Sequence, residues 1–227
     1  MKNLLYLLCF AFLAPVFAQQ SDFRLVSFEK ADAIAQRYEG ETLHNLPALV
    51  IRLTAQLDTD VEKFRAIYYW ISHNIRGDYD LMSTNERYFR KYRNDPEALQ
   101  AWMVAHKKKV FDMLLNDKVT LCTGYAYLVQ TMAQFAGIEA EIIHGYSNVR
   151  LKKNGFNQAP NHSWNAVKLN GKWYLCDATW SSGVMNTSNY KFEAAFEDSY
   201  FLMDPVLFAE DHIPVDEKWK LLPEKTQ

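Results

Sequence analysis

An Asn-Gly pair at positions 170 and 171 separates two segments of alternating polarity, and this combination predicts an antiparallel β-hairpin. The two segments are residues 163–169 and 172–177. Folding at the turn pairs residues whose numbers sum to about 341, so His162 should lie within about two residues of the position opposite Asp177. Because side chains alternate between the faces of a strand, His162 and Asp177 can then meet while Cys176 points to the opposite face.

A second local pattern predicts a helix that begins at Cys122. Apolar residues recur at spacings of three and four from Tyr125 to Ala136, and Gly137 follows as a helix stop. The first turn of a helix carries backbone N–H groups without intrahelical partners and the positive end of the helix dipole. Cys122 is therefore expected where the pKa of a thiol is lowered.

Cys122, His162 and Asp177 together have the residue types of a thiol-based acyl-transfer site. In this interpretation Cys122 is the nucleophile, and its backbone N–H helps to stabilise the oxyanion. His162 acts first as a base and then as an acid. Asp177 accepts a hydrogen bond from the far nitrogen of the imidazole and so selects its tautomer.

Three motifs around these residues resemble those of the transglutaminase-like superfamily of papain-type cysteine enzymes, namely G-x-C-x-G-Y-A, H-x-W and D-x-T. They correspond to CTGYA at 122–126, HSW at 162–164 and DAT at 177–179. Residues 69–75, 211–216 and 219–222 are similar to the branch of the superfamily named for kyphoscoliosis peptidase, so the resemblance spans roughly residues 60–222. Thr120 stands where the family usually has glycine, and this leaves open how closely a substrate backbone can approach at that position.

The resemblance implies a papain-like α+β fold, in which a central helix carrying Cys122 packs on an antiparallel sheet carrying His162 and Asp177. The order of the patterns agrees with this class, because helical periodicity dominates the first half of the chain and strand alternation follows it. Helices are expected at 31–37, 46–57, 59–77 and 95–116, and a further strand at 139–146. Loops are expected at 78–94, 147–161 and 181–199, the first of them near the site.

The first 18 residues are typical of a signal peptide, because Lys2 precedes a short apolar run and small residues precede Gln19. We therefore expect an exported protein, periplasmic or secreted, with an N-terminal helical extension at 19–58 and a transglutaminase-like domain at 59–222. The apolar run is too short for stable membrane insertion. A formal net charge of −2 gives no indication of a nucleic-acid partner.

Cysteine content bears on the proposed nucleophile. After removal of the leader only Cys122 and Cys176 remain, in a compartment where disulfides persist. Since the two side chains are predicted to point in different directions, we expect Cys122 to be a free thiol.

Tyr125, Trp164 and Trp180 are the candidates for substrate binding, and the two tryptophans are equally compatible with the core. His73, His144 and His212 are expected to be structural or surface residues. No CxxC or HExxH spacing is present, so neither a metal nor a cofactor is expected.

These patterns favour a cysteine acyl-transfer enzyme that acts on amide bonds of a peptide or protein, with hydrolysis as the expected outcome. Bacterial members of the superfamily are commonly regarded as proteases, which supports the same interpretation. Two alternatives remain open from the sequence: transglutaminase-type cross-linking or deamidation, and a non-catalytic protein-binding module on the same fold. The substrate and the oligomeric state are not determined by the sequence.

Overall fold

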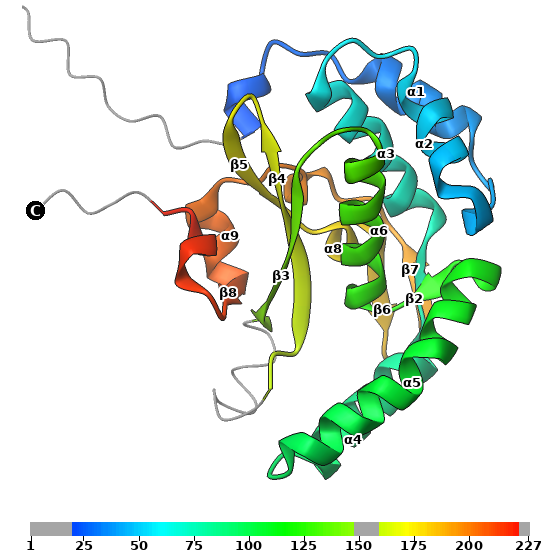
Figure 1. Ribbon diagram of the computed structural model, residues 1–227, viewed down its shortest axis with the longest axis vertical. Helices are drawn as coiled ribbons and strands as arrows, with labels where there is room; N and C mark the ends of the chain where they lie inside the picture. Colours follow the sequence, from blue (N-terminus) through cyan, green and yellow to red (C-terminus); the bar gives the residue numbers. More distant parts are fainter. Residues whose placement is uncertain (1–19, 148–158, 223–227) are drawn as a thin grey trace, which may run out of the picture.

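The computed structural model describes residues 20–147 and 159–222, and its centre is a four-stranded antiparallel sheet with the strand order β5-β4-β3-β8 (Figure 1). Helix α6 (Cys122–Phe135) packs on one face of this sheet, against β3 and β4. The fold is therefore α+β, as the sequence predicts. The strands are β3 (Ala140–Ser147), β4 (His162–Leu169), β5 (Lys172–Cys176) and β8 (His212–Pro214).

The hairpin formed by β4 and β5 has the predicted register. Leu169 pairs with Lys172 and Asn165 pairs with Cys176, and both pairs have the expected sum. Asn170 and Gly171 have φ values of 51° and 80°, the left-handed conformations that a tight two-residue hairpin turn requires. The turn and the alternation of the strands thus specify one register between them.

Helix α3 (Asp60–Asn74) is the central helix of the first half of the chain. The predicted capping box is present, because the Thr59 side chain and the Glu62 side chain each bond the backbone of the other residue. Helices α1 (Glu29–Arg37) and α2 (Leu46–Thr54) pack on α3, and short 3-10 turns lie at η1 (Gln20–Phe23) and η2 (Leu43–Asn45). Ile34, Leu53 and Phe64 belong to the same buried cluster as α6, so these helices share one core with the sheet.

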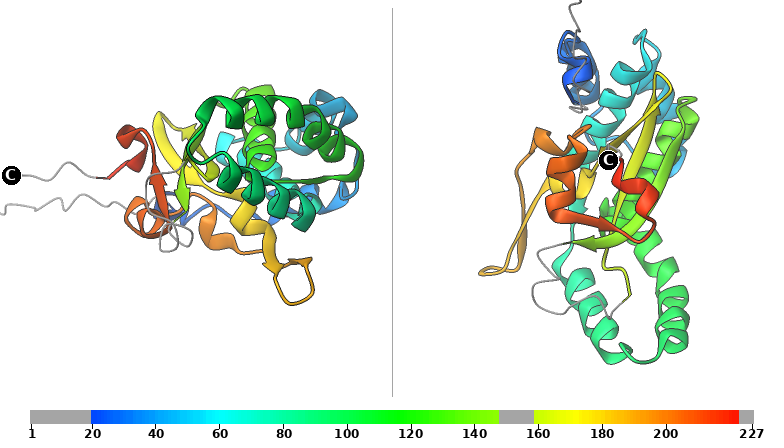
Figure 2. Two further views of the ribbon diagram at one scale, coloured as in Figure 1. Left: turned by 90° about the horizontal axis from the view of Figure 1, so that it is seen from below. Right: turned by 90° about the vertical axis from the view of Figure 1, so that its left-hand side faces the viewer.

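The other face of the sheet carries a smaller buried cluster that includes Ile143, Trp164 and Phe208. Phe208 comes from α9 (Pro205–Asp211), which leads into β8, and the 3-10 turn η4 (Glu217–Lys220) follows. We name residues 205–220, which contain α9, β8 and η4, the C-terminal segment. It covers the sheet on the side opposite α6 (Figure 2).

Helices α4 (Tyr79–Lys91) and α5 (Pro96–Asp117) form a helical hairpin that projects from the body of the molecule (Figure 1). We name it the arm. The expected loop at 78–94 is therefore wrong, whereas the helix expected at 95–116 is confirmed. Asp78 caps α4 by accepting a hydrogen bond from the Leu81 N–H at 2.7 Å, and Tyr88 stacks on Trp102 of α5 at 4.5 Å. Helix α4 is polar on average and buries only Leu81, which favoured the loop interpretation, although its few apolar residues do lie on one side of the helix.

Residues 181–199 are also more regular than expected. They contain the end of α8 (Ala178–Ser182), the hairpin of β6 (Gly183–Asn186) and β7 (Lys191–Ala194), and most of the 3-10 turn η3 (Asp198–Tyr200). Phe192 of this hairpin packs over Gly77, where an added Cβ would lie 3.1 Å from its ring. This long-range contact has no local sequence signature.

Most of the loop expected at 147–161, and the whole predicted leader, lie outside the described residues. Within the described residues, none of the helices combines the length and the apolar character needed to cross a lipid bilayer.

Candidate active site

Cys122 is the first residue of α6, as the helical pattern predicts, and it is half-buried. Strand β2 (Val119–Thr120) pairs in parallel with β1 (Arg76–Gly77) immediately before it, so the residues that lead into the helix are held by a neighbouring strand. The helix places the backbone N–H groups of its first turn beside the Cys122 sulfur. These groups are suited to stabilise negative charge on the sulfur or on a substrate oxygen.

His162 and Asp177 lie at neighbouring ends of β4 and β5. The Nε2 atom of His162 lies 2.6 Å from Oδ2 of Asp177, and both side chains are buried. Asp177 is also the N-cap of α8, where Oδ1 accepts hydrogen bonds from the N–H groups of Thr179 at 2.8 Å and Trp180 at 3.2 Å. The carboxylate is therefore held at both oxygens, and its orientation toward His162 is fixed.

Cys122 completes this arrangement, because His162 is the group that acts most strongly on its thiol after burial. Burial alone would raise the pKa of the Cys122 thiol, but the hydrogen bond and charge of His162 and the backbone of Ser163 outweigh burial and lower the pKa. Burial would likewise lower the pKa of His162, whereas Asp177 and Cys122 raise it to about 10. Because Nε2 of His162 is bonded to Asp177, Nδ1 is the ring nitrogen left to face the sulfur. The geometry thus favours a thiolate-imidazolium pair near neutral pH.

A second imidazole, from His212, binds the same carboxylate and was not identified from the sequence as part of the site. Its Nε2 lies 3.0 Å from Oδ2 of Asp177, and its ring is buried and stacked on Phe208 at 3.9 Å. Burial lowers the pKa of His212 more than Asp177 raises it, so the ring is neutral near pH 7. Nδ1 of His212 has no partner among the described residues, which is consistent with a proton on Nε2 that is donated to Asp177.

The expectation that His212 is a structural or surface residue therefore missed its position at the site. The signal that could have identified it is the resemblance of residues 211–216 to the family branch, although nothing in that segment points to Asp177. His73 is an exposed residue of α3, and His144 is an exposed residue of β3 whose Nδ1 lies 2.9 Å from Oγ of Ser163.

The donor atoms of His162, Asp177 and His212 all lie within 4.8 Å of one another, a spacing at which three such groups could hold a metal ion. Both imidazoles direct Nε2 at one carboxylate oxygen, at 2.6 and 3.0 Å. These distances are those of charge-assisted hydrogen bonds to a shared acceptor. In this structure the three side chains are therefore arranged as a hydrogen-bond network and not as a set of metal ligands.

The three candidates for substrate binding occupy different environments. Tyr125 is buried, and its hydroxyl donates to the carbonyl of Ile75 at 2.8 Å. Trp164 is buried in the cluster on the opposite face of the sheet. Trp180 is half-buried, and its ring stacks on His162 with a centroid distance of 5.5 Å. Only Trp180 of the three therefore combines a contact with His162 and surface that a substrate can reach.

Thr120, which replaces the usual glycine, directs its side chain into the protein. It is fully buried, and a Cβ added to Gly124 would lie 2.0 Å from its Oγ1. The side chain of Thr120 therefore occupies the space left by Gly124, and it does not narrow the approach to Cys122.

The two cysteines in the described residues are both free, as expected. Cys176 is fully buried in the main core, and burial raises the pKa of its thiol well above the usual value. A protonated, enclosed thiol of this kind is unreactive.

Several known proteins are similar to this chain. Kyphoscoliosis peptidase from Homo sapiens is 36% identical over 200 residues, which cover 87% of this chain and 27% of that protein. The Mus musculus protein of the same name is 37% identical over 203 residues, which cover 88% of this chain and 27% of that protein. Hillarin from Drosophila melanogaster is 24% identical over 216 residues, which cover 87% of this chain and 23% of that protein. This chain thus spans about a quarter of the length of these relatives.

A crystal structure of a TGase matches with a TM-score of 0.39 and 12% identity, over 71% of this chain and 35% of that chain. The assignment to a family rests instead on sequence. The model of the transglutaminase-like superfamily matches residues 47–178, which is more than half of the chain and includes Cys122, His162 and Asp177. The chain therefore belongs to the transglutaminase-like superfamily.

Proposed function

We propose that the protein is a cysteine peptidase that hydrolyses an amide bond of a peptide or protein through a thioester intermediate. The observation that carries the proposal is the contact of His162 with both Cys122 and Asp177, which lowers the pKa of the thiol and holds the imidazole in the productive tautomer. The similarity to proteins named kyphoscoliosis peptidase supports the same class of reaction.

In the first half of the reaction the Cys122 thiolate attacks the substrate carbonyl. The resulting oxyanion lies against the backbone N–H of Cys122 at the start of α6. His162 donates its Nδ1 proton to the leaving amine as the C–N bond breaks, which leaves an acyl group on the sulfur. Asp177 stabilises the imidazolium throughout and does not exchange a proton itself.

In the second half water attacks the thioester, and His162 accepts a proton from that water. The carboxylic acid product leaves, and the thiolate-imidazolium pair is restored. We favour hydrolysis over transfer to an amine because Cys122 is half-buried, whereas transfer to an amine requires an acyl-enzyme that is shielded from water. The leader-like first 18 residues support export, with the reaction taking place in the periplasm or outside the cell.

The test is a peptide-library cleavage profile of the wild type and of Cys122→Ala, each with and without an added primary amine. We expect new peptide termini with the wild type, none with Cys122→Ala, and the same products when the amine is present. Amine-capped products in place of free carboxylates would identify a transglutaminase. An absence of turnover, together with a thiol that alkylates at the rate of free cysteine, would refute the enzyme proposal.

A further inference from the structure

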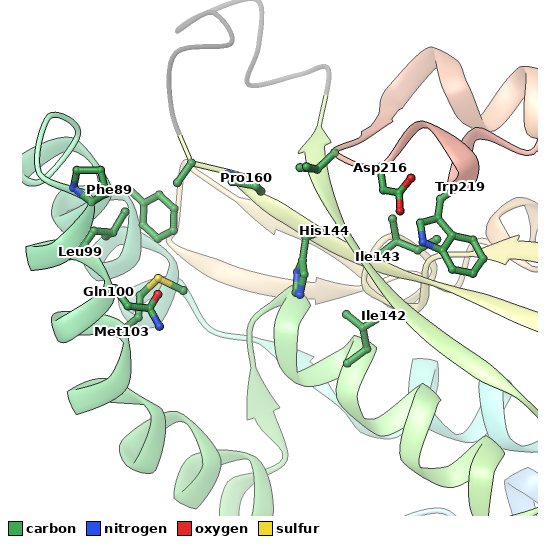
Figure 3. A pocket seen from close by; sticks show the side chains of 13 residues that line it. Phe89, Leu99, Gln100, Met103, Ile142, Ile143, His144, Pro160, Asp216 and Trp219 are labelled. Carbon is green, nitrogen blue, oxygen red and sulfur yellow. The ribbon is translucent and has the colours of Figure 1, made fainter.

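A cavity of about 640 Å³ lies between the arm, strand β3 and the C-terminal segment (Figure 3). Its lining is mainly apolar and comes from these three parts of the chain and from Ala159 and Pro160 before β4, while Asp216 of the C-terminal segment adds a carboxylate. Its apolar surface includes the side chains of Phe89, Leu99, Met103, Ile142, Val215 and Trp219. Its volume falls within the range of about 300–1,000 Å³ that is usual for ligand sites, so it can enclose more than one bulky side chain.

The cavity is connected to the candidate active site through Ser163. The backbone of Ser163 lies close enough to Cys122 to lower the pKa of its thiol, and Oγ of Ser163 lies 2.9 Å from Nδ1 of His144. His144 in turn lines the cavity, and its side chain lies between the arm and the C-terminal segment in Figure 3. A ligand in the cavity would therefore be separated from the thiol by Ser163 and His144.

The spacing of strands gives the distance that a substrate would have to span. Neighbouring antiparallel residues lie about 4.5–5.5 Å apart, and the rise along a strand is about 3.3 Å per residue. Ser163 pairs with His144, and Ile142 lies two residues further along β3. The path from Ser163, which neighbours Cys122, to Ile142 in the lining of the cavity is therefore about 8–12 Å, or two to four residues of extended chain.

The geometry points to a specificity pocket that binds a bulky apolar side chain of a polypeptide substrate, two to four residues from the bond that Cys122 attacks. This inference rests on the proposed function and adds a substrate class to it. Met103 and Val215 face the cavity with 40% and 58% of their surface exposed, so an apolar occupant would remove both from water. Gln100 and His144 in the lining can hydrogen bond the backbone of an extended peptide.

The inference is tested by binding to Cys122→Ala, which separates recognition from turnover. The probes are fluorescein-labelled octapeptides of alanine and glutamine that carry Phe, Ala or Asp at one position in turn, and binding is followed by fluorescence anisotropy. At one or two positions we expect the Phe peptide to bind about 10- to 100-fold more tightly than the Ala peptide. The Asp peptide should bind no better than the Ala peptide.

Met103→Glu, made in the same Cys122→Ala background, should abolish most of this preference because it places a carboxylate in an apolar cavity. Val104→Glu is the matched control, since Val104 is the next residue of α5, is 63% exposed and does not line the cavity. Val215→Glu tests the opposite wall independently. Thermal unfolding of each variant shows that the fold is retained.

The outcomes separate this inference from the proposed function. If Cys122 alkylates as a thiolate-imidazolium pair but no position shows an apolar preference, the pocket is refuted and the enzyme is not. If the apolar preference is present and sensitive to Met103→Glu while Cys122 behaves as an ordinary thiol, the pocket stands and the enzyme proposal fails. Concentration-dependent self-association that Met103→Glu abolishes would assign the cavity to a second copy of the chain and overturn the inference.

Discussion

Asp177→Asn is the substitution that most directly tests the geometry of the site, because it changes charge and proton donors with almost no change of shape. In the wild type each carboxylate oxygen accepts two hydrogen bonds: Oδ1 from the N–H groups of Thr179 and Trp180, and Oδ2 from His162 and His212. The amide oxygen of an asparagine would keep the two backbone bonds. Its NH₂ group would then face both imidazoles.

The two histidines should respond differently to this change. Nδ1 of His212 has no partner among the described residues, so the proton can move to that nitrogen while Nε2 accepts from the amide. His162 can bond the amide only by placing its own proton on Nδ1, the nitrogen that faces Cys122. In that tautomer it cannot accept the thiol proton. Burial would also lower the pKa of His162 once the charge of Asp177 is gone.

The size of the effect follows from these two losses. A hydrogen bond to a charged group contributes about 1.5–3 kcal/mol, and the unfavourable tautomer adds about 1 kcal/mol. Since about 1.4 kcal/mol corresponds to a factor of ten in rate, kcat/KM should fall roughly 100- to 1,000-fold. Cys122→Ala should abolish turnover and sets the baseline.

Kinetics of peptide cleavage and thermal unfolding should be measured on the same preparations of the wild type and Asp177→Asn. The raised pKa of His162 contributes stability that is present below about pH 6.5 and is lost as the pH rises toward 10. The depressed pKa of Asp177 contributes stability that is present above about pH 3.8 and is lost as the pH falls. The wild type should therefore exceed the variant in stability most clearly between about pH 4 and 6.5. Unchanged kcat/KM and an unchanged pH profile of stability would refute the role of Asp177.

Three further outcomes are expected. His212→Gln can keep a donor for Asp177 and should retain most activity, whereas His212→Ala should lower kcat/KM about 10-fold and unfold at a lower temperature. Equal activity of the two variants would contradict a positioning role for His212. The rate of Cys122 alkylation against pH should show an ionisation below the usual value of about 8.5 that moves upward in His162→Ala, and an identical profile in both proteins would contradict the ion pair. Gly124→Ala should lower the free energy of unfolding by about 1–3 kcal/mol in denaturant unfolding, because the new methyl group meets Thr120. Adding Thr120→Gly to this variant should restore part of that loss. Strictly additive effects of the two substitutions would contradict the contact.

Local sequence patterns were sufficient to predict a structural feature wherever that feature depends on a short stretch of chain. The Asn170-Gly171 turn and the alternating polarity on both sides of it specify the hairpin. The register of the hairpin then brings His162 to Asp177. The start of α6 at Cys122 and the capping box at the start of α3 are likewise encoded within a few residues. These signals are local because turn conformation, helix periodicity and capping involve neighbours along the chain.

Other features depend on contacts that no local pattern records. Helix α4 of the arm was not predicted because it is polar on average and buries only Leu81, and the stacking of Tyr88 on Trp102 of α5 contributes to its stability. The β6–β7 hairpin was missed for a similar reason, since Phe192 packs on the distant Gly77. In both cases tertiary packing supplies the stability that the segment lacks by itself.

The same distinction applies to the site. The sequence by itself determined the three residue types and brought two of them together through the hairpin. Only the tertiary structure placed His212 on Asp177, because that contact joins residues 35 positions apart through the pairing of β8 with β3. The burial of Tyr125 and Trp164, and the cavity beside His144, were also decided by how helices and strands pack. The identity of a side chain determines which chemistry it can perform. The distances between side chains, and their exposure to water, are set only when separate helices and strands pack together.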